Sequence, residues 1–92
     1  MKIIEINNIK YIIEKDFKNG IDNELLTEYI TDYFTEFDYI FGDWSYGKLR
    51  LKGFNDESNK KSNEYNNIKN INKYIKDYCA YGCSHFILKK AK

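Results

Sequence analysis

The chain has 92 residues, of which 42% are hydrophobic and 17% aromatic, and its formal net charge is +1. This length predicts one domain over residues 1–92, with large aromatic rings filling much of its core. No apolar run approaches the ~20 residues of a membrane span, and the N-terminal MKIIEINN lacks the pattern of a signal or transit peptide. With two cysteines and no secretion signal, we expect a cytoplasmic protein with free thiols and no membrane contact.

The small net charge conceals an uneven distribution along the chain. Residues 1–47 carry 4 Lys and 10 acidic residues, a net charge of −6, whereas residues 48–92 carry 11 basic and 4 acidic residues, a net charge of +7. Either the two halves neutralise each other within one fold, or a basic surface faces an anionic partner.

Residues 2–17, KIIEINNIKYIIEKDF, have the pattern of a β-hairpin. Two β-branched runs flank Asn7-Asn8, and Asn tolerates the positive φ that a tight turn requires. Residues 21–37, IDNELLTEYITDYFTEF, predict a single helix with Asp22 as its N-cap and one continuous apolar face.

The opposite face of that predicted helix carries four acidic residues and no lysine to pair with them. Their spacing of four residues places them on one ridge: Glu24, Glu28, Asp32 and Glu36. Like charges at this spacing destabilise a helix by about 0.2–0.5 kcal/mol per pair. The ridge is therefore either a solvated face or the docking surface of an adaptor that binds a basic protein partner.

The second half of the chain predicts strands at 38–42 (DYIFG), 48–54 (KLRLKGF) and 83–90 (CSHFILKK), with the last strand central in the sheet. Residues 55–67 predict a mobile polar loop. Residues 68–79 predict a second helix whose inward side chains are Ile68, Ile71, Ile75 and Tyr78. The order ββαββαβ predicts an α+β domain, with the two helices on one face of a mostly antiparallel sheet.

Residues 42–47, GDWSYG, predict the turn between two of these strands. Gly42 and Gly47 let the chain reverse without a steric penalty from Cβ, and Asp43 can accept hydrogen bonds from the turn amides. Trp44 and Tyr46 fall on one side if the loop is extended. The two rings then either close over the core or remain available to a partner.

Beside these rings, the only arginine of the chain belongs to a basic row on one strand face. Aromatic rings that stack on bases, next to cations that contact phosphates, are typical of surfaces that bind single-stranded nucleic acid. A row of lysines also protects an edge strand from aggregation. We predict a partner-binding surface for RNA or a ribonucleoprotein, formed by Trp44, Tyr46, Lys48, Arg50 and Lys52.

Two stretches, DYIFGDWSYGKLRLKGF at 38–54 and YIKDYCAYGCSHFILKK at 74–90, together resemble a known family. The YutD-like family of small bacterial proteins, typical of Firmicutes, carries a similar G-D-W-x-Y-G-x-L-R-L-K-G-F run and a later Y-C-x-x-G-C-x-x-F stretch. The resemblance covers most of the chain and departs from the family in the Asn-rich 55–67 loop and the short tail. It implies an α+β fold and a bacterial cytoplasmic protein, and it supplies no activity.

Cys79, Cys83 and His85 are the remaining candidates for chemistry. The C-x3-C spacing differs from that of thioredoxin-like or zinc-knuckle motifs, and a structural zinc site needs a fourth ligand, for which Asp43 is the candidate. The first interpretation is two small buried thiols and a core histidine, and the alternatives are a metal site or a redox pair. With one His, no G-x-S-x-G and no Walker loop, we predict neither enzymatic activity nor a cofactor.

Overall fold

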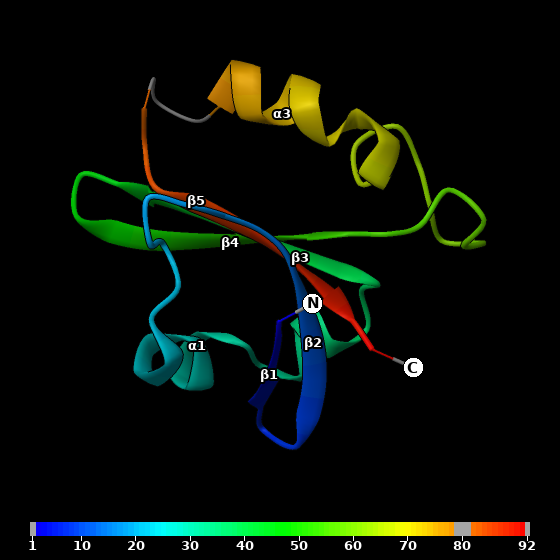
Figure 1. Ribbon diagram of the computed structural model, residues 1–92. Helices are drawn as coiled ribbons and strands as arrows, with labels where there is room; N and C mark the ends of the chain where they lie inside the picture. The colour runs from blue at the N-terminus through cyan, green and yellow to red at the C-terminus, as the bar shows by residue number, and fades with distance from the viewer. Residues whose placement is uncertain (1, 79–81, 92) are drawn as a thin grey trace.

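The computed structural model describes residues 2–78 and 82–91, and its sheet has five antiparallel strands in the order β1-β2-β5-β3-β4 (Figure 1). The strands are β1 (Ile3–Ile6), β2 (Ile9–Phe17), β3 (Tyr39–Ser45), β4 (Lys48–Phe54) and β5 (His85–Lys90). The helices are α1 (Asn23–Tyr29), α2 (Asp32–Thr35), the 3-10 turn η1 (Ile68–Asn70) and α3 (Ile71–Tyr78). The predicted α+β class and the central position of the last strand are confirmed.

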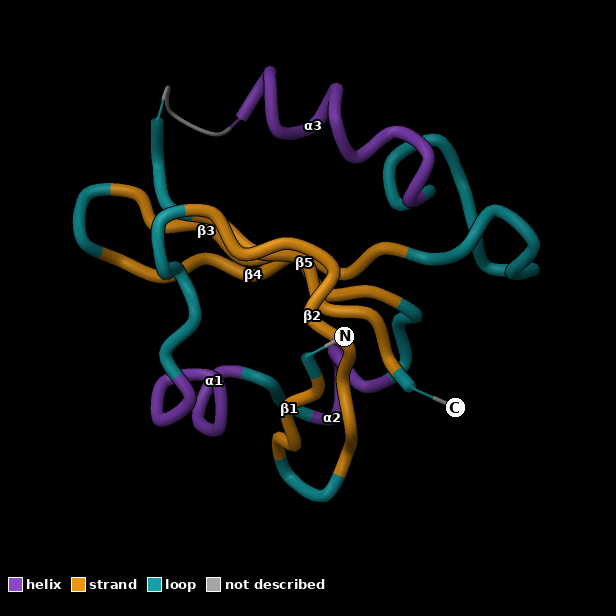
Figure 2. Tube along the Cα trace, in the orientation of Figure 1, coloured by secondary structure: helices purple, strands orange, loops and turns teal. Residues whose placement is uncertain are grey.

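The helices lie on both sides of the sheet, which corrects the prediction that they share one face. Figures 1 and 2 show α1 below the strands and α3 above them. The buried core lies on the α1 side and consists of Ile6, Tyr11, Leu26, Ile30, Ile40, Leu49, Phe86 and Leu88. The sheet needs cover on both faces because β5, at its centre, is largely apolar on each side.

The predicted helix over residues 21–37 is broken, so that prediction is wrong in its length. The predicted cap is confirmed, because the Asp22 carboxylate accepts from the Leu25 amide at 3.1 Å. At Ile30 the backbone turns extended and the side chain enters the core. The Asn7 side-chain amide donates to the carbonyls of Thr27 and Ile30, both at 3.1 Å, and so satisfies the end of α1 from the first hairpin.

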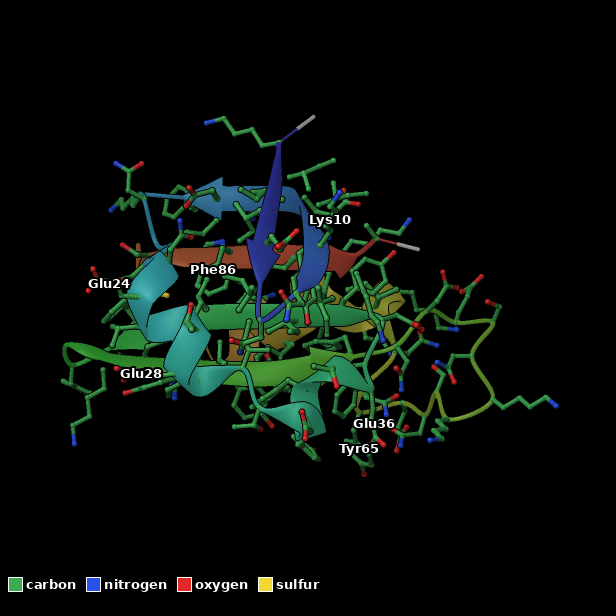
Figure 3. The ribbon with its side chains drawn as sticks, turned by 90° about the horizontal axis from the view of Figure 1, so that it is seen from below. Lys10, Glu24, Glu28, Glu36, Tyr65 and Phe86 are labelled. Carbon is green, nitrogen blue, oxygen red and sulfur yellow. The ribbon has the colours of Figure 1, made fainter. Side chains whose placement is uncertain are left out.

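This break divides the acidic ridge. Glu24 and Glu28 project from α1, whereas Asp32 begins α2 and Glu36 follows it. In Figure 3, Glu24 and Glu28 lie together on α1, and Glu36 lies apart from them, near Tyr65. The single four-residue ridge predicted from the sequence does not form, because its spacing depended on one uninterrupted helix.

The charge asymmetry of the chain becomes a separation between the two layers of helices. Helices α1 and α2 carry acidic residues and no Lys or Arg, whereas η1 and α3 carry Lys69, Lys73 and Lys76 against Asp77. Among the described residues, the ion pair that joins the two halves of the chain is Asp43–Arg50. The charged residues of the helices are thus acidic on one side of the sheet and mainly basic on the other.

The second hairpin has a shorter turn than the sequence predicts. β3 continues to Ser45, and the turn consists of Tyr46 and Gly47, whose φ angles of 52° and 76° indicate the type I′ geometry favoured in two-residue hairpins. Gly42 and Asp43 are therefore strand residues, and their predicted role in the turn is wrong, whereas Gly47 is in the turn. Gly42 serves close packing, because a Cβ there would lie 2.1 Å from Cζ of Phe86.

The Asn-rich segment 55–67, predicted to be a mobile loop, follows a hydrogen-bonded path. The Asn55 amide donates to the Asn66 carbonyl at 2.6 Å, and the Ile68 amide donates to the Asn55 carbonyl at 2.8 Å. The Asp38 carboxylate accepts from the Asn59 side chain at 2.9 Å. Asn and Asp side chains thus replace the backbone partners that a regular element would supply, which gives this composition a structural purpose.

Helix α3 presents a different residue to the sheet from the one predicted. The ring of Tyr74 packs edge-on against Phe41 and Phe54, with centroid distances of 5.5 and 5.4 Å. Tyr78, predicted to face inward, is 64% exposed. The 3-10 turn η1 has about three residues per turn, so it shifts the angular phase of the helix that follows.

Candidate functional site

The edge strand β4 carries three of the five residues that the sequence singled out as a partner-binding surface. Its predicted alternation is confirmed, because Leu49 lies in the core and Leu51 packs against it, while the basic residues between them point to the α3 side. That basic row consists of Lys48, Arg50 and Lys52. Each of its three members has a different environment.

Arg50 is engaged within the fold. Its Nε and Nη2 atoms donate to the two carboxylate oxygens of Asp43 at 3.0 and 2.6 Å, and Nη2 also donates to the Tyr78 carbonyl at 3.2 Å. The hydrogen bond to Asp43, followed by the attraction of its charge, raises the pKa of Arg50 against the opposing effect of desolvation. Asp43 is 3% exposed, so the guanidinium neutralises a buried carboxylate in place of the turn-capping role predicted for that aspartate.

Lys52 and Lys48 differ in how far they are available to a partner. The Lys52 ammonium lies over the rings of Phe54 and Tyr74, at 5.1 and 5.6 Å from their centroids. Tyr74 has a raised pKa, first because it is buried and second because of the Asp43 charge, so it stays neutral beneath this ammonium group. Lys48 is exposed next to the turn. Two members of the basic row, Arg50 and Lys52, thus make contacts within the protein, and Lys48 is exposed.

The two aromatic residues of the predicted surface lie apart. Trp44 faces the core side of the sheet, and its indole nitrogen donates to the Gly20 carbonyl at 2.7 Å. Tyr46 stands at the turn with its side chain fully in solvent. β3 continues as a regular strand through Trp44, which pairs with Leu49. The Trp44 side chain therefore lies on the opposite face of the sheet from the basic row. The part of these five residues in binding a partner remains a prediction.

The backbone of β4 offers a further set of groups. The Trp44 amide donates to the Ser84 carbonyl at 3.0 Å and the Lys90 amide donates to the Asp38 carbonyl at 2.9 Å, so the even-numbered residues of β3 bond to β5. The odd-numbered residues of β3 therefore bond to β4. It follows that the amides and carbonyls of Leu49, Leu51 and Gly53 point away from the sheet, and within the described part of the chain they have no hydrogen-bond partner. We call this row of outward groups the β4 edge.

Two cavities include residues from the end of this strand. The first, of about 290 Å³, is bordered by α2 and the end of β4, with Tyr33, Phe37, Leu51, Gly53 and Tyr65 in its lining. The second, of about 410 Å³, lies beneath α3 and includes Phe54, Tyr65, Lys73, Tyr74 and Tyr78. We call them the α2-side and α3-side cavities. Tyr65 contributes to the lining of both cavities.

Tyr33 and Tyr65 are the residues of this region that the sequence analysis missed. They are 62% and 75% exposed, although both rings line a cavity. Tyr33 has the spacing of the apolar helix face, and its ring contacts Phe37 edge-on at 5.3 Å. Tyr65 was the detectable signal, because it is the single aromatic residue between Asn55 and Asn67.

The cysteine and histidine candidates are only partly described. Cys79 lies outside the described residues, and Cys83 is disulfide-bonded, so the expectation of a free thiol is wrong for Cys83. Cysteine usage therefore no longer supports the inference of a reducing compartment. Within residues 2–78 and 82–91, no group of His, Cys, Asp and Glu is placed to hold a metal ion.

His85 is buried, as the first interpretation expected. Its ring stacks on Phe17 at 4.9 Å, and Nδ1 lies 3.0 Å from the Cys83 carbonyl. Its Nε2 has no partner among the described atoms. These contacts give the imidazole a packing role, and a metal or redox role for Cys79, Cys83 and His85 stays a prediction.

Comparison with known proteins identifies the family of this chain. Residues 5–89 match the family model described as "Putative antitoxin YutD-like". The chain belongs to the YutD-like family. It is 39% identical over 90 residues to the Bacillus subtilis (strain 168) protein named "Putative antitoxin YutD", covering 98% of this chain and 99% of the relative.

The solution NMR structure of protein yutD from B. subtilis has the same fold as this YutD-like chain. Its TM-score is 0.80 at 38% identity, covering 100% of this chain and 84% of that chain. The resemblance drawn from the two sequence stretches is thus confirmed for the family and for the α+β fold. Among the described residues of this YutD-like chain, no helix is long and apolar enough to cross a membrane.

Proposed function

We propose that this YutD-like protein is a non-catalytic binding domain of the bacterial cytoplasm that acts by contacting another protein. The observation that carries the proposal is the β4 edge, a row of backbone groups without hydrogen-bond partners among the described residues, near two cavities that are lined by aromatic residues. Both its relative and its family are named putative antitoxin. An antitoxin opposes the action of a partner, and contact with that partner is enough for such a role.

The side chains near this edge support a protein partner over a nucleic acid. Asp43 occupies the charge of Arg50, which leaves Lys48 and Lys52 as the two available cations of the basic row. Phosphate contacts need several available cations, because affinity for nucleic acids grows with the number of phosphates neutralised. The exposed tyrosines around the two cavities are residues that are enriched in protein interfaces.

An RNA or ribonucleoprotein partner is the second candidate. It is favoured by Tyr46, whose ring is fully exposed next to the exposed Lys48. A ring of this kind can stack on an unpaired base while the lysine contacts the adjoining phosphate. The remaining acidic surface on α1, with Glu24 and Glu28, offers a third location for a basic protein partner.

Affinity purification of the tagged protein from its own cytoplasm, with and without nuclease, separates these candidates. We expect a protein that stays bound after nuclease treatment. Replacing Tyr33 and Tyr65 together by alanine should lower its recovery, whereas the matched control Glu24→Gln with Glu28→Gln should leave it unchanged. Loss of all captured material with nuclease would transfer the proposal to RNA, and loss in the control alone would transfer it to α1.

A further inference from the structure

We propose that the β4 edge binds an extended segment of a partner protein as a sixth strand, and that this segment alternates carboxylate side chains with apolar or aromatic ones. The inference rests on the proposed function, since it assumes a protein partner and adds how that partner is held. Strand addition of this kind uses main-chain hydrogen bonds for affinity and alternate side chains for specificity.

The first reason is the length and regularity of the strand. β4 has 7 residues, and its register with β3 runs without a shift from Ser45↔Lys48 to Tyr39↔Phe54. The other edge strand of the sheet, β1, has 4 residues. Natural edges are blunted by shortness, bulges, proline, lysines or covering elements. β4 has none of the first three, whereas it carries Lys48 and Lys52, and Gly53 at its end is buried next to the Phe37 ring.

The second reason is that the chain already pairs with this edge one residue further along. Asn55 forms a parallel bridge with Asn67, through the hydrogen bonds to Asn66 and from Ile68. This bridge shows that the outward backbone groups at odd-numbered positions can pair with another segment. At Asn55 these groups are already bonded to residues 66 and 68 of the chain itself. Three positions remain for a partner, namely Leu49, Leu51 and Gly53.

The side chains on either side of the edge define the chemistry of the added strand. Because side chains alternate across a sheet, one set would face the α3 side, where Lys48 and Lys52 lie. Carboxylates there would meet cations directly across the strands, which is a favourable cross-strand pair. The other set would face the α2-side cavity, where Tyr33, Phe37 and Leu51 offer an apolar and aromatic lining.

A second copy of this chain is a poor occupant of the same edge. Outward groups occur at odd-numbered positions, so any antiparallel pairing of two β4 edges sets even-numbered residues against even-numbered residues. The basic residues at 48, 50 and 52 of one copy would then lie opposite those of the other. Like charges directly opposite each other are destabilising, so charge complementarity selects an acidic strand.

The test uses synthetic peptides of the length of β4, 7 residues, in which glutamate alternates with tyrosine and leucine. Titration into the isotope-labelled protein should shift the amide signals of Leu49, Leu51 and Gly53 and slow their hydrogen exchange. A peptide N-methylated at the amides that face β4 should bind about tenfold more weakly or worse, since each lost hydrogen bond weakens binding severalfold. The matched control, N-methylated at the amides that face away, should bind as well as the parent peptide.

A second set of measurements uses the protein in place of the peptide. The variant Lys48→Glu with Lys52→Glu should lose the glutamate peptide and gain affinity for the same peptide with lysine in place of glutamate, with the fold verified by circular dichroism. Any of four results would overturn the inference: no binding of the parent peptide, equal loss with both N-methylated peptides, shifts centred on β1, or displacement of the peptide by single-stranded RNA. Concentration-dependent dimerisation that protects the same three amides would also overturn it, in favour of a second copy.

The two proposals fail in different ways. If the captured cellular protein survives nuclease treatment and is still recovered by the Lys48→Glu, Lys52→Glu variant, the protein-binding function stands and strand addition is wrong. If nuclease releases everything that is captured, the proposed function itself is wrong, whatever the peptides do.

Discussion

The turns of the two hairpins have nearly the same backbone geometry and different surroundings. Asn7 and Asn8 have φ angles of 51° and 68°, and Tyr46 and Gly47 have φ angles of 52° and 76°. In the first turn, the Asn7 side chain reaches back to cap α1. In the second turn, the Tyr46 side chain contacts solvent only, at full exposure.

Asn7 in the first turn therefore contributes to the fold, whereas the Tyr46 side chain in the second turn makes no contact that stabilises it. Asn is among the residues that adopt a positive φ most readily, whereas a bulky aromatic residue does so at a cost. Tyr46 recovers none of that cost through packing. Residues in disfavoured conformations that gain nothing locally are candidates for function, which is the reason to test the second hairpin as a binding element.

The largest effect is expected at the base of the second hairpin. Gly42→Ala would place a Cβ 2.1 Å from Cζ of Phe86, both residues being buried at the centre of the sheet. We expect a loss of about 3 kcal/mol in unfolding free energy, measured by urea denaturation, because the fully buried ring must shift within a packed core. Gly47→Ala meets no atom within 4 Å and has only the positive φ of 76° to accommodate, so it should cost about 1 kcal/mol.

Two further comparisons test whether the contact with the Phe86 ring causes the loss at Gly42. Phe86→Leu in the Gly42→Ala background should recover part of the lost stability, although Phe86→Leu alone is destabilising. Equal losses for Gly42→Ala and Gly47→Ala would show that Gly42 serves conformational freedom, as a turn residue would, and that the contact with the Phe86 ring is unimportant.

The next largest effect concerns the ion pair of the second hairpin. Arg50→Ala leaves the carboxylate of Asp43 buried without its partner, and we expect a loss of about 2–3 kcal/mol in unfolding free energy. This expected loss is at or below the lower end of the range for breaking a buried ion pair, because the Arg50 side chain is 49% exposed. Asp43→Asn, which removes the charge that needs compensation, should cost only about 1 kcal/mol.

Lys48→Ala is the matched control for this pair, since it removes a cation from the same strand and the same face. It should change stability by less than about 0.5 kcal/mol. If Arg50→Ala is as mild as Lys48→Ala, the Arg50–Asp43 contact contributes nothing, and the whole basic row becomes available to a partner.

In the first hairpin, the corresponding experiment removes the cap on α1. Asn7→Gly keeps the positive φ accessible and deletes both side-chain hydrogen bonds, to Thr27 and Ile30. We expect a loss of about 1–2 kcal/mol, with faster hydrogen exchange in α1. Asn8→Gly should be close to neutral, because no hydrogen bond of the Asn8 side chain is found within the described residues. An equal effect of the two substitutions would mean that only the turn conformation matters.

The same comparison shows which features were predictable from sequence. The turn at Asn7-Asn8, the Asp22 cap and the alternation along 48–54 depend on contacts within a few residues, and all three were predicted. The break at Ile30 depends on Asn7, 23 residues away, and no local pattern reports it. The extension of β3 through Trp44 likewise depends on His85 of the central strand and on Ser84, which directly precedes that strand.

The candidate site was predicted less completely than the fold. The sequence pointed to strand 48–54 with Trp44 and Tyr46 as a binding surface, which stays a prediction. It did not reveal that the Trp44 indole is anchored to Gly20 and the Arg50 guanidinium to Asp43. The β4 edge could not be predicted, because strand order decides which strand lies at an edge. Tyr33 and Tyr65 come together only through that topology.

The smallest expected effect has the opposite sign. Tyr46→Asn creates an Asn-Gly pair, the residues that type I′ turns favour most, so we expect the variant to be more stable by up to about 1 kcal/mol in thermal and urea unfolding. The matched control Tyr46→Phe keeps the ring at the same φ and should leave stability unchanged. If Tyr46→Asn raises stability and lowers recovery of the cellular partner while Tyr46→Phe retains it, the ring is kept for contact at the expense of the turn. A more stable variant that captures its partner as well as the parent would exclude Tyr46 from the interface and leave the β4 edge as the binding element of this hairpin.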